Sequence, residues 1–138
     1  MATRRVLIVD DEALVRKTLS DILCAMRYSD TLEVEEASSG REGLDAVVRQ
    51  RPDLVLLDLQ MPGMSGLALL KQIREVEPRL SVIVISATQD NKMSSKALRN
   101  GAVAYLPKPF NPRHVEMLAT TFLDSSKPRP SKPGPGAR

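Results

Sequence analysis

Several residue types that build common functional sites are scarce in this chain of 138 residues. A single cysteine, Cys24, excludes a disulfide framework and a zinc site built from several cysteines. A single histidine, His114, excludes a metal centre built from several histidines. There is no tryptophan, and two tyrosines and two phenylalanines are too few for a surface that stacks on single-stranded nucleic acid.

Long hydrophobic runs are missing as well. No apolar stretch approaches the roughly 18 residues that a membrane span needs. Near the start of the chain, residues 6–9 are apolar but are followed at once by Asp10, which is too short a run for a signal-peptide core. We therefore expect a soluble, cytoplasmic protein with no membrane partner.

The net charge of +3 comes from one end of the chain. Residues 125–138 hold four of the ten prolines and four basic residues but no acid, and such a segment cannot bury enough surface to offset its ordering entropy. Removing these four from the 20 basic residues leaves 16 against 17 acidic ones. We predict a domain in residues 1–124, followed by a disordered tail or cut linker whose few charges support no specific nucleic-acid binding.

Three unbroken apolar runs, at residues 6–9, 54–57 and 82–85, have the pattern of strands buried on both faces of a parallel sheet. Weaker strand candidates are residues 32–37 and 102–106.

Helical spacing of apolar residues separates these runs. Ser39 and Glu42 form a capping box, Asn111 before Pro112 is a helix start, and Gly101 stands where a glycine ends a helix. Cys24 is expected to be a packed thiol beside the first stripe. The positions that the spacing places on the helix stripes are Val15, Leu19, Ile22, Leu23, Met26, Leu44, Val47, Val48, Leu70, Ile73, Val76, Met93, Ala97, Leu98, Val115, Leu118 and Phe122.

A strand followed by a helix, five times over, predicts an α/β fold with a parallel sheet covered by helices on both faces. In such sheets ligands bind at the carboxyl ends of the strands. The residues just past these ends are Asp10, Asp11, Asp58, Ser86 and Lys108.

Three carboxylates at one sheet edge repel one another unless a cation neutralises them. A hard divalent ion with oxygen ligands fits, and we expect Mg²⁺, with Mn²⁺ as an acceptable substitute. Lys108 adds a point charge for a phosphate and Ser86 a hydroxyl donor. Asp10 and Asp11 have an alternative role as a cap of the first helix, but the other residues at the edge favour metal binding.

Asp58 stands alone at the end of its strand. A carboxylate beside a metal and a lysine is able to attack phosphorus in line, and the product is an aspartyl phosphate.

Four motifs carry a family resemblance: VLIVDDE at 6–12, LVLLDLQMPGMSG at 54–66, VIVISA at 82–87 and YLPKPF at 105–110. Together they resemble the receiver domain of two-component response regulators, over about residues 4–124. The resemblance implies a flavodoxin-like, doubly wound sheet of five strands in the order 2-1-3-4-5 with five flanking helices.

The resemblance also implies roles for individual residues. Asp58 matches the phosphoacceptor, Asp10 and Asp11 match the acidic pair that holds Mg²⁺, and the backbone carbonyl of Gln60 matches a further metal ligand. Lys108 matches the lysine that contacts the phosphoryl group, and its bond to Pro109 is expected to be cis.

Ser86 and Tyr105 match a switch pair whose hydroxyl moves toward the phosphate while the ring turns inward. The implied donor is a phosphohistidine on a sensor histidine kinase or phosphotransfer protein. The implied output is a change of affinity for a downstream protein at the face made by the fourth helix, fifth strand and fifth helix. A phosphorelay shuttle and a receiver fragment of a larger transcription-type regulator remain alternatives.

Two other functions are disfavoured by the sequence. A turnover phosphatase working through Asp58 needs a second acid two residues later, where Gln60 stands, so we expect no turnover enzyme. The turn after the first strand lacks the glycines of a nucleotide-binding loop.

Overall fold

The computed structural model describes residues 3–28, 31–63, 65–87 and 91–125. The predicted tail lies outside these residues from position 126 onward, so its disorder stays a prediction. Within the described residues, no helix has the length and apolar character required to cross a bilayer.

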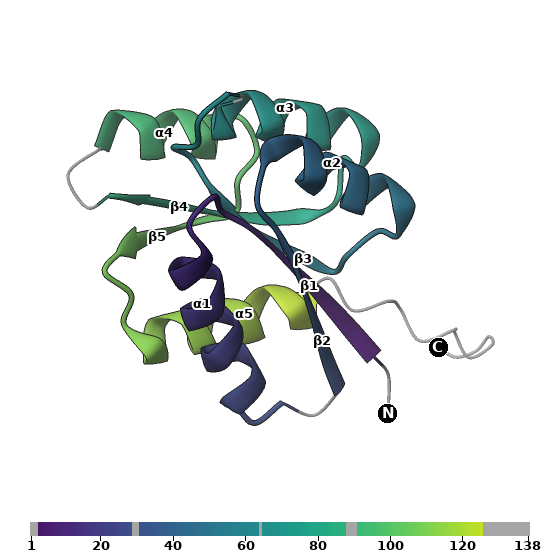
Figure 1. Cartoon of the computed structure of the whole chain (residues 1–138), viewed down its shortest axis with the longest axis vertical. Coiled ribbons are helices and arrows are strands. Elements are labelled where there is room, and N and C mark those ends of the chain that lie inside the picture. The colour runs from purple at the N-terminus through teal and green to yellow at the C-terminus, as the bar shows by residue number, and fades with distance from the viewer. Residues whose placement is uncertain (1–2, 29–30, 64, 88–90, 126–138) are drawn as a thin grey trace.

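Five strands and five helices alternate along the chain, as the sequence predicts (Figure 1). The strands are β1 (Thr3–Val9), β2 (Thr31–Ala37), β3 (Leu54–Asp58), β4 (Ser81–Ala87) and β5 (Ala104–Lys108). The helices are α1 (Ala13–Ala25), α2 (Gly40–Arg49), α3 (Gly66–Val76), α4 (Asn91–Arg99) and α5 (Pro112–Ser125).

All strand pairs are parallel, and their order is β2-β1-β3-β4-β5, which confirms the predicted topology. Helices α1 and α5 cover one face of the sheet, and α2, α3 and α4 cover the other (Figure 1). Alternate residues of one strand enter different cores: Val6 and Ile8 pack toward α1 and α5, whereas Leu7 and Val9 pack toward α2 and α3. The three central strands β1, β3 and β4 contain unbroken apolar runs because both of their faces are buried, whereas the edge strands β2 and β5 are only partly buried.

Helix α2 packs on the sheet largely with the predicted face, because Leu44 and Val47 both contact the core, but one predicted position differs. Val48 is 66% exposed, although its spacing placed it on the apolar stripe. The buried stripe is made of Gly40, Gly43, Ala46 and Val47, and a Cβ on Gly43 would meet Val9 Cγ2 at 2.9 Å. Small residues let this helix approach the sheet closely, and a pattern of large apolar residues does not reveal them.

Three other positions also differ from the prediction. Val76, the last residue of α3, and Leu98, in the last turn of α4, are exposed. Cys24 is exposed as well, because it follows the buried Leu23 and one helical step rotates it away from the core.

Strand β5 begins two residues later than predicted, at Ala104. The residues before it end α4: Gly101 has φ +104°, and the N–H of Ala102 donates to the carbonyl of Ala97 at 3.0 Å. Arg74 of α3 secures this turn, since Nη2 donates to the carbonyl of Gly101 at 2.7 Å and Nη1 to that of Pro78 at 2.8 Å. Gly101 therefore ends the helix, as the sequence predicts.

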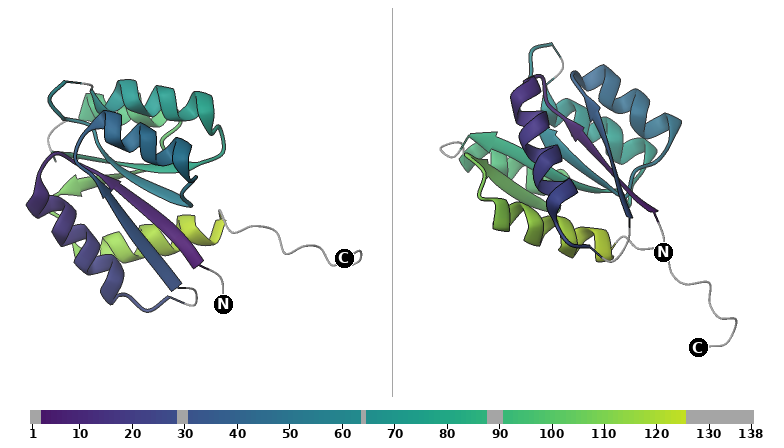
Figure 2. Two further views of the ribbon diagram at one scale, coloured as in Figure 1. Left: turned by 45° about the vertical axis from the view of Figure 1, so that its right-hand side comes forward. Right: turned by 60° about the horizontal axis from the view of Figure 1, so that its bottom comes forward.

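The end of α5 is fixed beside the start of β1 (Figure 2). Arg4 is buried, and its Nη2 donates to the carbonyl of Leu123 at 2.8 Å. The hydroxyl of Tyr28 donates to Asp124 Oδ1 at 2.9 Å. Both contacts hold the last turn of α5 at the amino-terminal end of the sheet.

Candidate functional site

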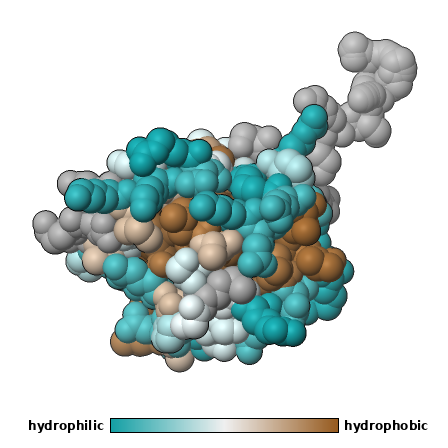
Figure 3. Space-filling view, turned by 90° about the horizontal axis from the view of Figure 1, so that it is seen from above, coloured by the Kyte–Doolittle hydropathy of each residue, from teal (hydrophilic) through white to brown (hydrophobic). Residues whose placement is uncertain are grey.

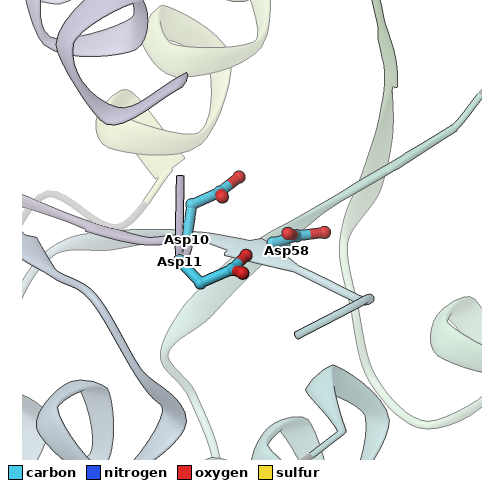
Figure 4. Close-up of side chains that lie close together, drawn as sticks. All are labelled: Asp10, Asp11 and Asp58. Atoms are coloured by element: carbon cyan, nitrogen blue, oxygen red, sulfur yellow. The ribbon is translucent and has the colours of Figure 1, made fainter. Parts of the chain in front are cut away.

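The carboxyl ends of three strands bring three carboxylates and a lysine together, as predicted. Asp10 follows β1, Asp58 ends β3 and Lys108 ends β5. Carboxylate oxygens of Asp10, Asp11 and Asp58 lie within 4.8 Å of one another (Figure 4). Lys108 Nζ lies 3.6 Å from Asp10 Oδ2 and 3.8 Å from Asp58 Oδ2. Asp10 and Asp58 are 0% and 2% exposed, whereas Asp11 is open to solvent.

Backbone hydrogen bonds hold one oxygen of each buried carboxylate. Asp10 Oδ1 accepts from the N–H of Glu12 at 2.8 Å, and Asp58 Oδ1 accepts from the N–H of Gln60 at 3.0 Å. Helix α1 starts after Glu12, whose side chain makes no capping bond. Asp10 Oδ2 is buried and accepts no hydrogen bond within the described part of the chain. Helix capping leaves this oxygen unexplained.

The acidic residues suit a hard divalent cation. Lys108 Nζ, 3.6 Å from Asp10 Oδ2, is beyond hydrogen-bonding distance, so a closer cation would stabilise this buried carboxylate oxygen further. Asp10, Asp11 and Asp58 offer only oxygen ligands, which suits Mg²⁺ or Mn²⁺. Gln60 lies two residues after Asp58, in the loop that follows β3, and the role of its backbone carbonyl as a further ligand stays a prediction.

Burial controls the electrostatics of the site. Burial raises the pKa of Asp58 to about 6; the Gln60 N–H and Lys108 oppose this shift, and the charges of Asp10 and Asp11 add to it. Burial also raises the pKa of Asp10. Partial burial works against the charged form of Lys108, but Asp58, Asp10 and Glu12 together raise its pKa.

The pKa of Asp58 predicts how stability depends on pH when no divalent metal is bound. The carboxyl titrates at about 6 in the folded protein, above its unfolded value near 4, so the folded state holds the proton more tightly between these values. The contribution of Asp58 to the free energy of unfolding therefore falls as pH rises from about 4 to 6, by roughly 2–3 kcal/mol. Asp58→Asn should remove this loss.

Urea unfolding with EDTA at pH 4.5 and 7.5 checks this prediction. Asp58→Asn should be more stable than wild type at pH 7.5, and the two proteins should differ less at pH 4.5. Asp45→Asn, on the exposed side of α2, is the matched control and should follow wild type. Equal stability of Asp58→Asn and wild type at pH 7.5 would contradict the raised pKa.

The two residues predicted as a switch pair lie on adjacent strands. Ser86 is buried near the end of β4, and its hydroxyl makes a long 3.4 Å contact with the carbonyl of Ala87. Tyr105 of β5 is partly exposed, and its hydroxyl donates to the same carbonyl at 3.2 Å. Their roles in switching stay predictions.

Two contacts of the site were not predicted. Lys108 Nζ lies 3.5 Å from Glu12 Oε1, so this lysine faces three acids. Arg16 Nη1 donates to the backbone carbonyl of Asp10 at 2.7 Å, while its Nε donates to Glu36 Oε1 at 3.0 Å. Arg16 thus links the backbone of Asp10 to the end of β2. The sequence pattern indicates only that Arg16 belongs to a helix and does not predict these contacts.

Comparison with known proteins identifies the family. The family model described as "Response regulator receiver domain" matches residues 6–119. The chain therefore belongs to the response regulator receiver domain family, whose members act as signalling modules of two-component systems.

Individual relatives agree with this assignment. The chain is 38% identical over 112 residues to the chemotaxis protein CheY of Thermotoga maritima, covering 81% of this chain and 91% of that protein. It is 44% identical over 104 residues to the DNA-binding transcriptional regulator NtrC of Klebsiella pneumoniae, covering 75% of this chain but only 21% of NtrC. The crystal structure of the receiver domain of NtrX from Brucella abortus superposes with a TM-score of 0.80 at 31% identity, over 87% of this chain and 98% of that one.

Proposed function

We propose that this chain is a phosphorylation-dependent switch that accepts a phosphoryl group on Asp58 from a phosphohistidine of a sensor kinase or phosphotransfer protein. The observation that carries the proposal is the buried Asp58 carboxylate, which shares Lys108 with Asp10 at the carboxyl edge of the sheet. Asp10, Asp11, Asp58 and the carbonyl of Gln60 would hold Mg²⁺ or Mn²⁺. Bound metal would supply positive charge beside the phosphoryl oxygens.

The transfer forms one bond and breaks one. A carboxylate oxygen of Asp58 attacks the phosphorus, the bond from phosphorus to the donor imidazole nitrogen breaks, and that nitrogen keeps the electron pair. With a pKa of about 6, Asp58 is mostly ionised at neutral pH and therefore able to attack. Lys108 lies where it can stabilise the negative charge on the transferred group.

After transfer, the switch is proposed to run through Ser86 and Tyr105 to the face of α4, β5 and α5. The proposal takes residues 1–124 as the receiver unit and 125–138 as a tail or linker. It treats the chain as a cytoplasmic signalling component that undergoes phosphorylation and dephosphorylation, with no separate substrate to turn over.

Intact mass spectrometry after incubation with acetyl phosphate tests the proposal. One phosphoryl increment should appear with Mg²⁺ and should be absent with EDTA. If no increment forms while calorimetry still detects Mg²⁺ binding, phosphorylation is not the function and the chain is an interaction domain of the receiver type.

Lys108→Ala separates phosphorylation from switching. The three carboxylates remain, so the dissociation constant for Mg²⁺ should not increase, and Asp58 should still be phosphorylated, although more slowly. Lys108 connects the site to the end of β5. The change in amide hydrogen exchange across α4, β5 and α5 on phosphorylation should therefore be lost. Lys71→Ala, on the exposed side of α3, should keep that change; if Lys108→Ala also keeps it, the role given to Lys108 is wrong.

One comparison favours a second candidate. Because the match to NtrC covers only a fifth of that protein, the chain also fits the receiver part of a larger transcription-type regulator. Sequencing the gene through its natural stop codon tests this: an open frame past residue 138 that encodes a further domain would establish it.

A further inference from the structure

Helix α4 carries three cations on one exposed face. Lys92, Lys96 and Arg99 follow one another at intervals of four and three residues, so they share a side of the helix. With Ser95 they line a surface hollow of about 340 Å³. The buried residues Ser94 and Ala97 mark the opposite side. Figure 3 looks down on α2, α3 and α4, where hydrophilic residues cover much of the surface.

Several other cations of the molecule form ion pairs with acidic residues of the same chain. Arg5, Arg16 and Arg49, for example, each pair with a glutamate of β2. Among the residues that the structure describes, Lys92, Lys96 and Arg99 make no ion pair, and the α4 sequence contains no acid. Cations three and four residues apart repel one another along a helix. A carboxylate from another molecule would remove this repulsion.

The stability of α4 itself does not account for the whole row. Lys96 and Arg99 lie in the last turn, where cations favour the negative end of the helix dipole. Lys92 lies in the first turn, where a cation opposes the positive end. Two of the three charges therefore have a local explanation, and the third does not.

Two apolar residues are exposed at the C-terminal end of α4 and just beyond it. Leu98 of α4 and Val103, just before β5, are 46% and 37% exposed. We infer that the face of α4 formed by Lys92, Lys96 and Arg99 binds an acidic segment of a partner protein, with Leu98 and Val103 adding apolar contact. Charge complementarity is the basis for this choice of occupant.

A nucleic-acid partner fits these observations less well. The three cations span roughly 10 Å along the helix, enough for only a few phosphates. The folded body is close to neutral, with 16 basic and 17 acidic residues outside the tail, so it exerts little long-range attraction on a polyanion. The inference rests on the proposed function in one respect: the affinity for this partner is taken to depend on whether Asp58 is phosphorylated.

A random 12-residue peptide library displayed on phage, selected on the immobilised full chain, provides the test. The key variant combines Lys92→Gln, Lys96→Gln and Arg99→Gln. The control combines Arg41→Gln, Lys71→Gln and Arg79→Gln, which remove the same charge from exposed positions elsewhere. Circular dichroism should show both variants folded, because all six positions are exposed.

Enriched peptides should be rich in Asp and Glu, bind the α4 variant at least tenfold more weakly than wild type, and bind the control within threefold. Their affinity should fall as salt is raised. Enrichment without acidic residues, no enrichment, or equal binding to both variants would overturn the inference. So would a 12-nucleotide single strand that binds as tightly as the peptides and equally needs the α4 cations.

Parallel incubation with acetyl phosphate keeps the two proposals apart. If Asp58 is phosphorylated while peptide binding ignores the α4 cations, the docking inference alone fails. If Asp58 is not phosphorylated while acidic peptides still need these cations, the proposed function fails and the docking surface stands.

Discussion

Asp58→Asn should take up no phosphoryl group from acetyl phosphate under conditions in which the wild-type chain gains one. The amide keeps the shape of the carboxylate, and its oxygen can still accept the Gln60 N–H that now bonds to Asp58 Oδ1. It lacks the negative charge and the nucleophilic oxygen that attack on phosphorus requires. Intact mass spectrometry with Mg²⁺ measures this loss directly.

Asp45→Asn is the matched control, because it removes an exposed carboxylate from α2 and should leave the phosphoryl increment unchanged. An increment that persists in Asp58→Asn would show that another carboxylate is the acceptor. Asp11, the exposed member of the cluster, would then be the first residue to replace.

Gly66→Ala should be the most damaging small substitution in the domain. A Cβ at this position would lie 2.3 Å from the carbonyl oxygen of Asp58 and 2.4 Å from Cα of Leu59. Both are backbone atoms and cannot rotate away, so the start of α3 must move. We expect a loss of about 3 kcal/mol in the free energy of unfolding, at the upper end of the usual range for overpacking.

The new Cβ presses on the backbone of the acceptor Asp58 itself, so Gly66→Ala should also slow phosphorylation by about 100-fold, the cost of a misplacement of about 1 Å in a reacting group. Gly63→Ala is the control in the same loop. Its φ of +84° makes alanine unfavourable, by about 1 kcal/mol, but a Cβ there meets nothing within 4 Å. Urea unfolding and the initial rate of phosphoryl uptake should therefore rank Gly66→Ala well below Gly63→Ala; equal effects would show that contact with the Asp58 loop is unimportant.

Much of the fold could be predicted because its three central strands are buried on both faces. Residues 6–9, 54–57 and 82–85 are continuous apolar runs, and the polar residues that end them mark the site edge. Prediction was wrong for Val48 and Leu98, which are exposed, and it missed Gly43, a small residue that takes a buried position in α2; Ala97, beside Leu98 in α4, is buried as predicted. Apolar spacing locates large side chains and does not reveal how closely two backbones approach.

The sequence predicted that Asp10, Asp58 and Lys108 lie close together, but it did not predict all of their contacts. The topology alone places Asp10, Asp58 and Lys108 at one edge, because parallel strands end together. The contact of Lys108 with Glu12 and the bond from Arg16 to the Asp10 carbonyl depend on how α1 leaves the sheet. That angle is set by packing between distant segments, which sequence spacing does not report.

The contact between Arg4 and the Leu123 carbonyl determines where a following segment begins. Arg4 and Asp10 lie at opposite ends of β1, and six residues of extended strand span about 20 Å. Any chain that continues beyond Ser125 therefore starts its path far from Asp58. A domain attached there would receive the signal through rearrangement of the receiver surface, and a short connection would keep it out of direct reach of the phosphoryl group.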